Sequence, residues 1–370
     1  GVRLRTGKLL GLKPINLTLI KGPSDEDKFT VKRLQLFRDA GEWQELVNLE
    51  CEARVVASAV CKVWPEGATS IYRNLAQAHD NLQNFQRAID AYEQVRAIAQ
   101  EAGNKAGEGG VCGQIGRCLQ AKGEYQLAIT QHEQRLAIAK EVGNQVSEGL
   151  VLGDLGKCYH SLCQYEKSLA MHAQSLTVLE ETGNSAAVAA CYGDLGNCHA
   201  ALGNFERAIE THKECLKITK KVVNKNLEAQ TYMKLGACYR ALAACDEEQS
   251  VQHLKTAIDL LTMSRDIFAA TGRLEMNASA SLELALTHMA TVERRRRVDV
   301  CDVDELRVVA QGLKTAWELS EKHGLVGASM SAILHLARVT FMLAEEEQAL
   351  ELLRRYLQLA VEVGNVWCGG

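Results

Sequence analysis

The chain has 370 residues, of which 47% are hydrophobic and only 5% aromatic, and it contains 3 prolines. Long proline-free stretches rich in Ala, Leu, Glu, Lys and Gln favour α-helix, so parallel α/β enzymes and β-sandwiches are disfavoured. The net charge of −4 provides no general attraction to nucleic acid or to an anionic membrane. No apolar run reaches the ~20 residues that a bilayer span requires. We therefore expect an all-α protein that binds neither nucleic acid nor membrane.

Two segments precede the regular part of the chain. Residues 1–26 have strand-like or extended character and are predicted to lie outside the helical array. Residues 27–66 predict an atypical N-terminal helical hairpin, with Gly41 at its turn and Trp43 where later units carry Tyr125 or Phe205. The first segment has no role that we can assign from its residues.

A repeat of 40 residues organises most of the remaining chain. Three segments superimpose when shifted by 40, namely GQIGRCLQAKGEYQLAI (113–129), GDLGKCYHSLCQYEKSL (153–169) and GDLGNCHAALGNFERAI (193–209). Within a unit, apolar residues recur at helical spacing, a turn interrupts them, and a second helix ends where most units carry a glycine suited to the left-handed C-cap. Each unit is therefore predicted to be an antiparallel helical hairpin, with about eight such pairs in the chain.

The repeat array is predicted to span residues 67–364, with about seven repeats. Its frame shifts twice, which indicates insertions between the helices of a hairpin near residues 245–253 and 298–306. Stacked arrays tolerate insertions in such turns. Residues 365–370 are interpreted as a truncated C-terminal continuation, because no polar capping helix follows Gly364. Self-association through this uncapped end is a further expectation.

The repeat resembles the tetratricopeptide repeat. The residues at that motif's aromatic, Leu, Gly, aromatic, aromatic and Ala positions are Tyr192, Leu195, Gly196, His199, Phe205 and Ala208. The unit length, the closing acidic-Val/Thr-Gly-Asn phrase and a histidine in the second helix are similar to the repeats of LGN/Pins regulators and nephrocystin-like proteins. The resemblance implies an α-solenoid, a right-handed superhelix of stacked antiparallel helical hairpins. It further implies that the first helices line a concave groove for a peptide segment of a partner protein.

Helical geometry predicts which residues face this groove. If the apolar side of each first helix faces its partner helix, the polar positions between point to the groove side. This polar floor tends positive, which indicates a ligand that carries acidic residues. The candidate peptide-binding residues are Gln114, Arg117, Gln120, Asp154, Lys157, His160, Asp194, Asn197, Lys234 and Arg240.

Paired glycines mark the first helices of three units, at 113 and 116, 153 and 156, and 193 and 196. Each is expected to cost ~1 kcal/mol relative to alanine in a helix interior. The second glycine of each pair permits close packing of helices. The first, which falls on the predicted groove side, either lets a ligand main chain approach or also serves packing.

Cysteines recur at 118, 158, 198 and 238, with histidines at 132, 172 and 212, which raises the question of a metal site or a Cys/His nucleophile. Equivalent positions in stacked helices lie ~8 to 10 Å apart, whereas zinc holds its ligands at ~2.0 to 2.3 Å. We interpret them as packing positions and expect no metal and no cofactor. The 13 dispersed cysteines form no CxxC pair, so a reducing compartment and a cytoplasmic location are predicted.

The leading functional prediction is a non-catalytic scaffold for protein–protein interaction, because no phosphate loop, metal motif or nucleophile signature is present. The alternative is the regulatory or substrate-recruiting arm of a larger enzyme or MYND-type zinc-finger protein that continues beyond residue 370. The terminal Cys368-Gly369-Gly370 resembles the opening of such a finger. The arginine run at 294–297 is interpreted as a solvated helix end, with a nuclear-import signal or a contact to an acidic partner as the alternative.

Overall fold

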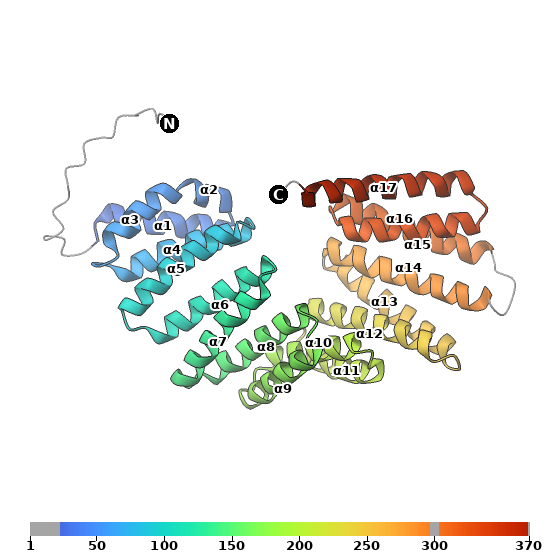
Figure 1. The fold of residues 1–370 in the computed structure, drawn as a ribbon, viewed down its shortest axis with the longest axis horizontal. Coiled ribbons are helices and arrows are strands. Elements are labelled where there is room, and N and C mark those ends of the chain that lie inside the picture. Colours follow the sequence, from blue (N-terminus) through green and yellow to red (C-terminus); the bar gives the residue numbers. More distant parts are fainter. Residues whose placement is uncertain (1–22, 297–302, 369–370) are drawn as a thin grey trace. The chain divides into compact units, whose positions relative to one another are not determined.

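The computed structural model describes residues 23–296 and 303–368, and these form helices joined by short turns, with no strand among them (Figure 1). The chain divides into two compact units, residues 1–147 and 148–370, and each is described by itself. Most of the predicted extended segment 1–26 lies outside the described residues. So do positions 298–302 of the second predicted insertion and the last two residues of the predicted continuation.

The first unit begins with three helices and continues as two hairpins. A capping box at Ser24 and Asp27 starts the first helix, and a break at Leu49 divides the next stretch into two short helices. From Pro65 to the end of this unit, each helix packs against the next one in the chain. The helices are α1 (Asp25–Ala40), α2 (Trp43–Asn48), α3 (Glu50–Val60), α4 (Pro65–Asn81), α5 (Phe85–Glu101), α6 (Lys105–Ala121) and α7 (Tyr125–Val142).

The second unit continues the same pattern of successive packed helices (Figure 1). Helices α12 and α13 have 21 residues each, against 17 for α10, so only residues 246–249 separate them. We call the even-numbered helices from α4 on first helices and their successors second helices. The helices are α8 (Gln145–Ser161), α9 (Tyr165–Glu181), α10 (Ser185–Ala201), α11 (Phe205–Lys221), α12 (Lys225–Cys245), α13 (Ser250–Ala270), α14 (Leu274–Arg296), α15 (Val303–Lys322), α16 (Val326–Met342) and α17 (Glu346–Cys368).

This architecture confirms the predicted all-α solenoid of helical hairpins, and the glycine-asparagine phrase explains how its units are joined. Gly103, Gly143 and Gly183 adopt the predicted left-handed conformation, with φ between 65° and 70°. The asparagine that follows each of them caps the next helix, as Asn184 does by accepting a hydrogen bond from the backbone N–H of Ala187 at 3.2 Å. The phrase therefore ends one helix and starts the next within three residues. The right-handed superhelix stays a prediction.

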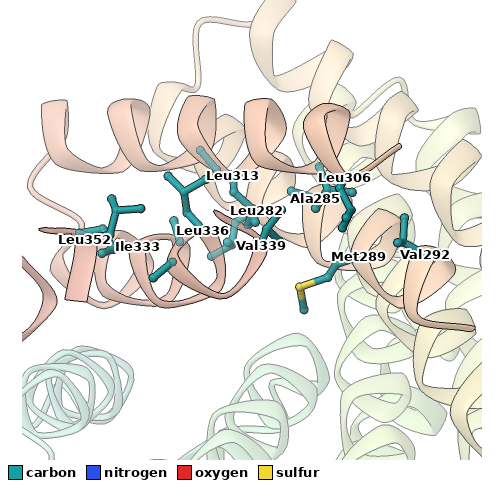
Figure 2. Packing of buried hydrophobic residues seen from close by; sticks show 14 residues of the cluster. Leu282, Ala285, Met289, Val292, Leu306, Leu313, Ile333, Leu336, Val339 and Leu352 are labelled. Carbon is teal, nitrogen blue, oxygen red and sulfur yellow. The ribbon is translucent and has the colours of Figure 1, made fainter. Parts of the chain in front are cut away.

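Apolar side chains from four successive helices form a large core cluster in the second unit (Figure 2). Leu282 and Met289 come from α14, Leu313 from α15, Leu336 from α16 and Leu352 from α17. Because each first helix packs between two second helices, the core runs along the unit without a single centre, as is typical of repeat proteins.

The recurring histidines are buried packing residues. The side chains of His132, His172 and His212 are at most 1% exposed. Each lies against the second glycine of its own hairpin, and a Cβ on Gly196 would come within 2.5 Å of the His212 ring. Only glycine leaves room for the imidazole, which confirms the predicted packing role of these glycines.

The first glycine of each pair also faces the second helix of its hairpin. A Cβ on Gly193 would lie 3.7 Å from Sγ of Cys215, and one on Gly113 would meet the side chain of Arg135. Gly153 likewise faces a residue of α9. The expectation that these glycines belong to the groove side is wrong, because the backbone at these positions is turned toward its partner helix. Packing is therefore the alternative that the structure supports.

The recurring cysteines lie in the same buried layer. Oγ of Ser168 donates a hydrogen bond to the carbonyl of Gly156 at 2.7 Å and lies 3.1 Å from Sγ of Cys198. Burial raises the pKa of the Cys118 thiol to about 12 and that of Cys238 to about 11. In the described part of the chain, no three His, Cys, Asp or Glu side chains lie close enough to hold a metal ion.

None of the helices that the structure describes combines the length and the apolar character needed to cross a membrane.

Candidate functional site

The first helices present polar side chains on the side turned away from their partner helices. These stand one residue before and, except at Ala237, two residues after the buried leucine or isoleucine at 75, 115, 155, 195 or 235. We call this set the first-helix surface and consider it separately in each unit. In the first unit it comprises Asn74, Gln77, Gln114 and Arg117; in the second it comprises Asp154, Lys157, Asp194, Asn197 and Lys234, with Arg240 six residues after Lys234.

In the first unit, two neighbouring cavities open on this surface. Their volumes are about 560 Å³ and 270 Å³, and both are lined by Arg73 and Gly107. The walls are α4 and α6, with the end of α5 beneath them. Gly110 also lines the smaller cavity, and a Cβ there would meet nothing within 4 Å. Together these cavities are large enough to hold several residues of a peptide.

Asn74 lines the larger cavity and carries an unused hydrogen-bond donor. The residue is only 1% exposed, and its Oδ1 accepts a hydrogen bond from Nη1 of Arg38 at 3.1 Å. Because arginine can only donate, this contact fixes Oδ1 and leaves the amide nitrogen Nδ2 for another partner. Nδ2 is buried and makes no hydrogen bond within the described part of the chain. The groove prediction missed Asn74, although it stands in the register of Gln114.

The predicted groove residues of the first unit lie on one helix. Gln114 lines the smaller cavity beside Tyr92 and accepts a hydrogen bond from Nη2 of the exposed Arg117 at 2.5 Å. Gln120 is half-buried near the end of α6 and does not line either cavity. The structure thus brings Gln114 and Arg117 into contact, and of the two only Gln114 lines the cavity.

In the second unit, basic residues of one first helix pair with acidic residues of the next. Nζ of Lys157 in α8 lies 3.8 Å from Oδ2 of Asp194 in α10. Arg240 in α12 forms a salt bridge with Glu283 in α14. Burial raises the pKa of Asp194, and Lys157 opposes that rise. Carboxylates of the protein itself therefore partly neutralise the predicted positive floor. One of them, Glu283, was not among the predicted groove residues.

The other predicted groove residues of this unit differ in exposure. Lys234 is exposed, whereas Asp154 and Asn197 are half-buried. The ring of His160 packs edge-on against Tyr165, with centroids 5.2 Å apart, at the turn between α8 and α9. His160 therefore helps to close its own hairpin, and its ring is less accessible to a ligand than the side chain of Lys234.

Comparison with known families gives a clear match. The sequence matches the tetratricopeptide repeat over residues 67–141, 111–181, 147–221 and 188–263, which together cover more than half of the chain. A comparison with curated proteins found no match. The narrower similarity to LGN/Pins and nephrocystin-like repeats stays a prediction.

Solved structures with a similar fold include three proteins of low sequence identity. The apo quorum sensor NprR from B. thuringiensis is 17% identical, with a TM-score of 0.65 over 91% of this chain and 89% of that one. Aspartyl phosphate phosphatase F from Bacillus subtilis is 11% identical, with a TM-score of 0.59 over 91% and 84%. A Rap protein in complex with competence and sporulation factor is 13% identical, with a TM-score of 0.51 over 93% and 99%. At these identities the likeness concerns the fold alone.

Proposed function

Because the chain belongs to the tetratricopeptide repeat family and its array is a protein-interaction scaffold, we propose that the first-helix surface binds a peptide segment of a partner protein. The observation that carries this proposal is the buried, unpartnered Nδ2 of Asn74 beside a cavity of about 560 Å³. A buried polar group without a partner costs roughly 1–3 kcal/mol. A carbonyl oxygen of a bound peptide would accept its hydrogen bond and remove that cost.

The neighbouring residues suit a peptide main chain. Gly110 leaves open space where a side chain would otherwise stand, so a backbone can approach α6 closely. The exposed Arg73, which lines both cavities, and the exposed Arg117, which is hydrogen-bonded to Gln114, provide cations for carboxylates of the ligand. The glycine that admits the ligand in this proposal is Gly110, in place of the Gly113 that the sequence pattern suggested.

We further propose that the first-helix surface of the second unit contributes to binding through its charged residues. An acidic ligand side chain can pair with Lys234 directly, because Lys234 is exposed. To reach Lys157 it must displace Asp194, an exchange of one ion pair for another. The residues proposed to contact ligand here are Asp154, Lys157, His160, Asp194, Asn197, Lys234 and Arg240.

The test of the first proposal is affinity capture followed by mass spectrometry with the native chain and an Asn74→Leu variant. Leucine has a branched side chain like that of asparagine but is larger and lacks the amide donor, so the ligand contact is lost, and the melting comparison below shows whether the fold is retained. The matched control is Asn81→Leu, an exposed position at the end of the same helix. Partners retained by the control and lost by Asn74→Leu support the proposal, provided that both variants melt as the native chain does. Equal capture by Asn74→Leu would refute it.

The acidic character of the ligand is tested by charge reversal. A variant with Arg117→Glu, Lys157→Glu and Arg240→Glu is expected to lose the same partners. The control reverses the same number of charges at exposed second-helix positions, as Arg87→Glu, Lys167→Glu and Lys217→Glu. Loss of capture in both triple variants would mean that overall charge, and not the first-helix surface, governs binding.

A further inference from the structure

A cavity in the second unit lies away from the first-helix surface. It has a volume of about 620 Å³ and is walled by two second helices, α15 and α17, with α16 between them. Its floor is apolar and includes Trp317, Leu336 and Leu352, the last two of which are labelled in the core view (Figure 2). This volume falls in the range of small-ligand and peptide pockets, roughly 300–1,000 Å³. We call it the α15–α17 cavity.

Trp317 departs from the repeat at this point. It stands seven residues before the left-handed turn residue Gly324, a place taken by leucine at 136, 176 and 216 in the regular repeats. Leucine meets the packing need with apolar volume alone, whereas tryptophan adds an N–H donor. Nε1 of Trp317 is buried and makes no hydrogen bond within the described part of the chain. Packing therefore does not account for the indole nitrogen, and a ligand acceptor in the cavity would.

The two walls of the cavity carry opposite charge. Helix α15 presents Arg307 and Lys314 toward it, two turns apart, and α17 presents Glu351, with Glu345 just before its first turn. Arg355 of α17 also lines the cavity, but its charge is paired with Glu321 of α15 at 2.9 Å. Arg307 is already paired with Asp304 at 3.1 Å. Among the residues that the structure describes, Lys314, Glu345 and Glu351 form no salt bridge, so one cation and two carboxylates at this cavity have their charge available to a ligand.

From this arrangement we propose that the α15–α17 cavity docks an amphipathic segment of a partner protein. Its apolar side chains would lie on the floor formed by Trp317, Leu336 and Leu352. Its acidic flank would face Lys314 on α15, and its basic flank would face Glu345 and Glu351 on α17. Because these charges stand at a solvated rim, they select the charge pattern of the ligand more than they add to its affinity. The site is separate from the first-helix surface and does not rest on its proposed role.

The test uses three synthetic amphipathic helical peptides that share a leucine stripe. One carries Glu on one flank and Lys on the other, one carries Lys on both flanks, and one carries Glu on both. Titration calorimetry is expected to show the mixed peptide binding roughly five- to tenfold tighter than either of the others. In a Glu345→Lys and Glu351→Lys double variant both walls are basic, so the preference should move to the peptide with Glu on both flanks. Trp317→Phe should weaken the mixed peptide several-fold.

Two control variants make the result decisive. Glu346→Lys with Glu347→Lys changes the net charge of the same helix by the same amount at exposed positions that do not line the cavity, and should leave the preference for the mixed peptide intact. Asn81→Leu should leave the affinity unchanged, because it alters an exposed position of α4 that belongs to neither proposed site. The proposal is overturned if the mixed peptide does not bind saturably, if the preference survives reversal of the acidic wall, or if either control removes binding.

Discussion

Two glycines one turn apart in α10 are expected to respond to alanine in opposite directions. A Cβ at Gly193 would lie 3.7 Å from Sγ of Cys215, an ordinary van der Waals contact. A Cβ at Gly196 would lie 2.5 Å from the ring of His212, which is only 1% exposed. The two substitutions add the same methyl group to the same helix, so the difference between them isolates the packing of the histidine.

The magnitudes follow from propensity and overpacking. Alanine is favoured over glycine in a helix interior by about 1 kcal/mol, so Gly193→Ala should raise the free energy of unfolding by up to that amount. Gly196→Ala gains the same propensity but must displace a buried ring, and overpacking of this kind costs roughly 1–3 kcal/mol. The net effect of Gly196→Ala is therefore destabilisation by up to about 2 kcal/mol.

Urea unfolding followed by circular dichroism at pH 7.5 measures both changes, as shifts of the midpoint relative to the native chain. A His212→Ala background provides the internal control, because removal of the ring should turn Gly196→Ala from destabilising to neutral or stabilising. If Gly196→Ala stabilises the native chain as Gly193→Ala does, then the imidazole does not occupy the space beside the glycine, and the packing account of the paired glycines fails.

Three further changes probe the turns and the buried histidines. Val223 holds a left-handed φ of 55° at a place where other units have glycine, and it is 72% exposed, so Val223→Gly should raise the melting temperature by the equivalent of about 1 kcal/mol. Asn184→Ala removes the cap on the backbone N–H of Ala187 and should lower the urea midpoint by the equivalent of about 1 kcal/mol; no change would show that water replaces the cap. Burial lowers the pKa of His172 and His212 to about 4, below the 6.5 of the unfolded chain. Between pH 6.5 and pH 4 the unfolded chain therefore binds protons that the folded chain does not, and the free energy of unfolding should fall by roughly 3 kcal/mol for each histidine. A His212→Met variant should lose less stability over that interval in a pH series of urea midpoints, and an identical loss would contradict the lowered pKa.

The architecture could be predicted from the residues because it depends on local patterns that recur. Leucine at 155 and 195, a turn glycine at 203 and a closing glycine at 183 each act within a few residues of their own position, and the repeat multiplies the signal. The capping of the following helix by asparagine is an equally local contact, from Asn184 to Ala187, but the glycine signal alone does not reveal it.

The candidate site could be predicted only in part, because it depends on contacts between units. The position of Lys157 on a first helix followed from periodicity, but its pairing with Asp194 depends on how consecutive first helices lie beside one another. The unused amide of Asn74 depends on Arg38, which comes from the irregular N-terminal helices, where no repeat fixes the alignment. The α15–α17 cavity depends on a gap between two second helices. The sequence indicated it only through Trp317, which stands at a repeat position where the regular units have leucine.

The buried thiols give the array a set of built-in chemical reporters. Buried cysteines lie in α6, α8, α10, α11 and α12, so each hairpin from α6 to α13 has at least one buried cysteine. A thiol with a raised pKa and no exposure reacts with an alkylating reagent only when its hairpin opens, because the thiolate is the reactive species. Peptide-level mass spectrometry of pulse-alkylated protein would therefore record, hairpin by hairpin, where the solenoid frays first and which part a bound partner holds closed.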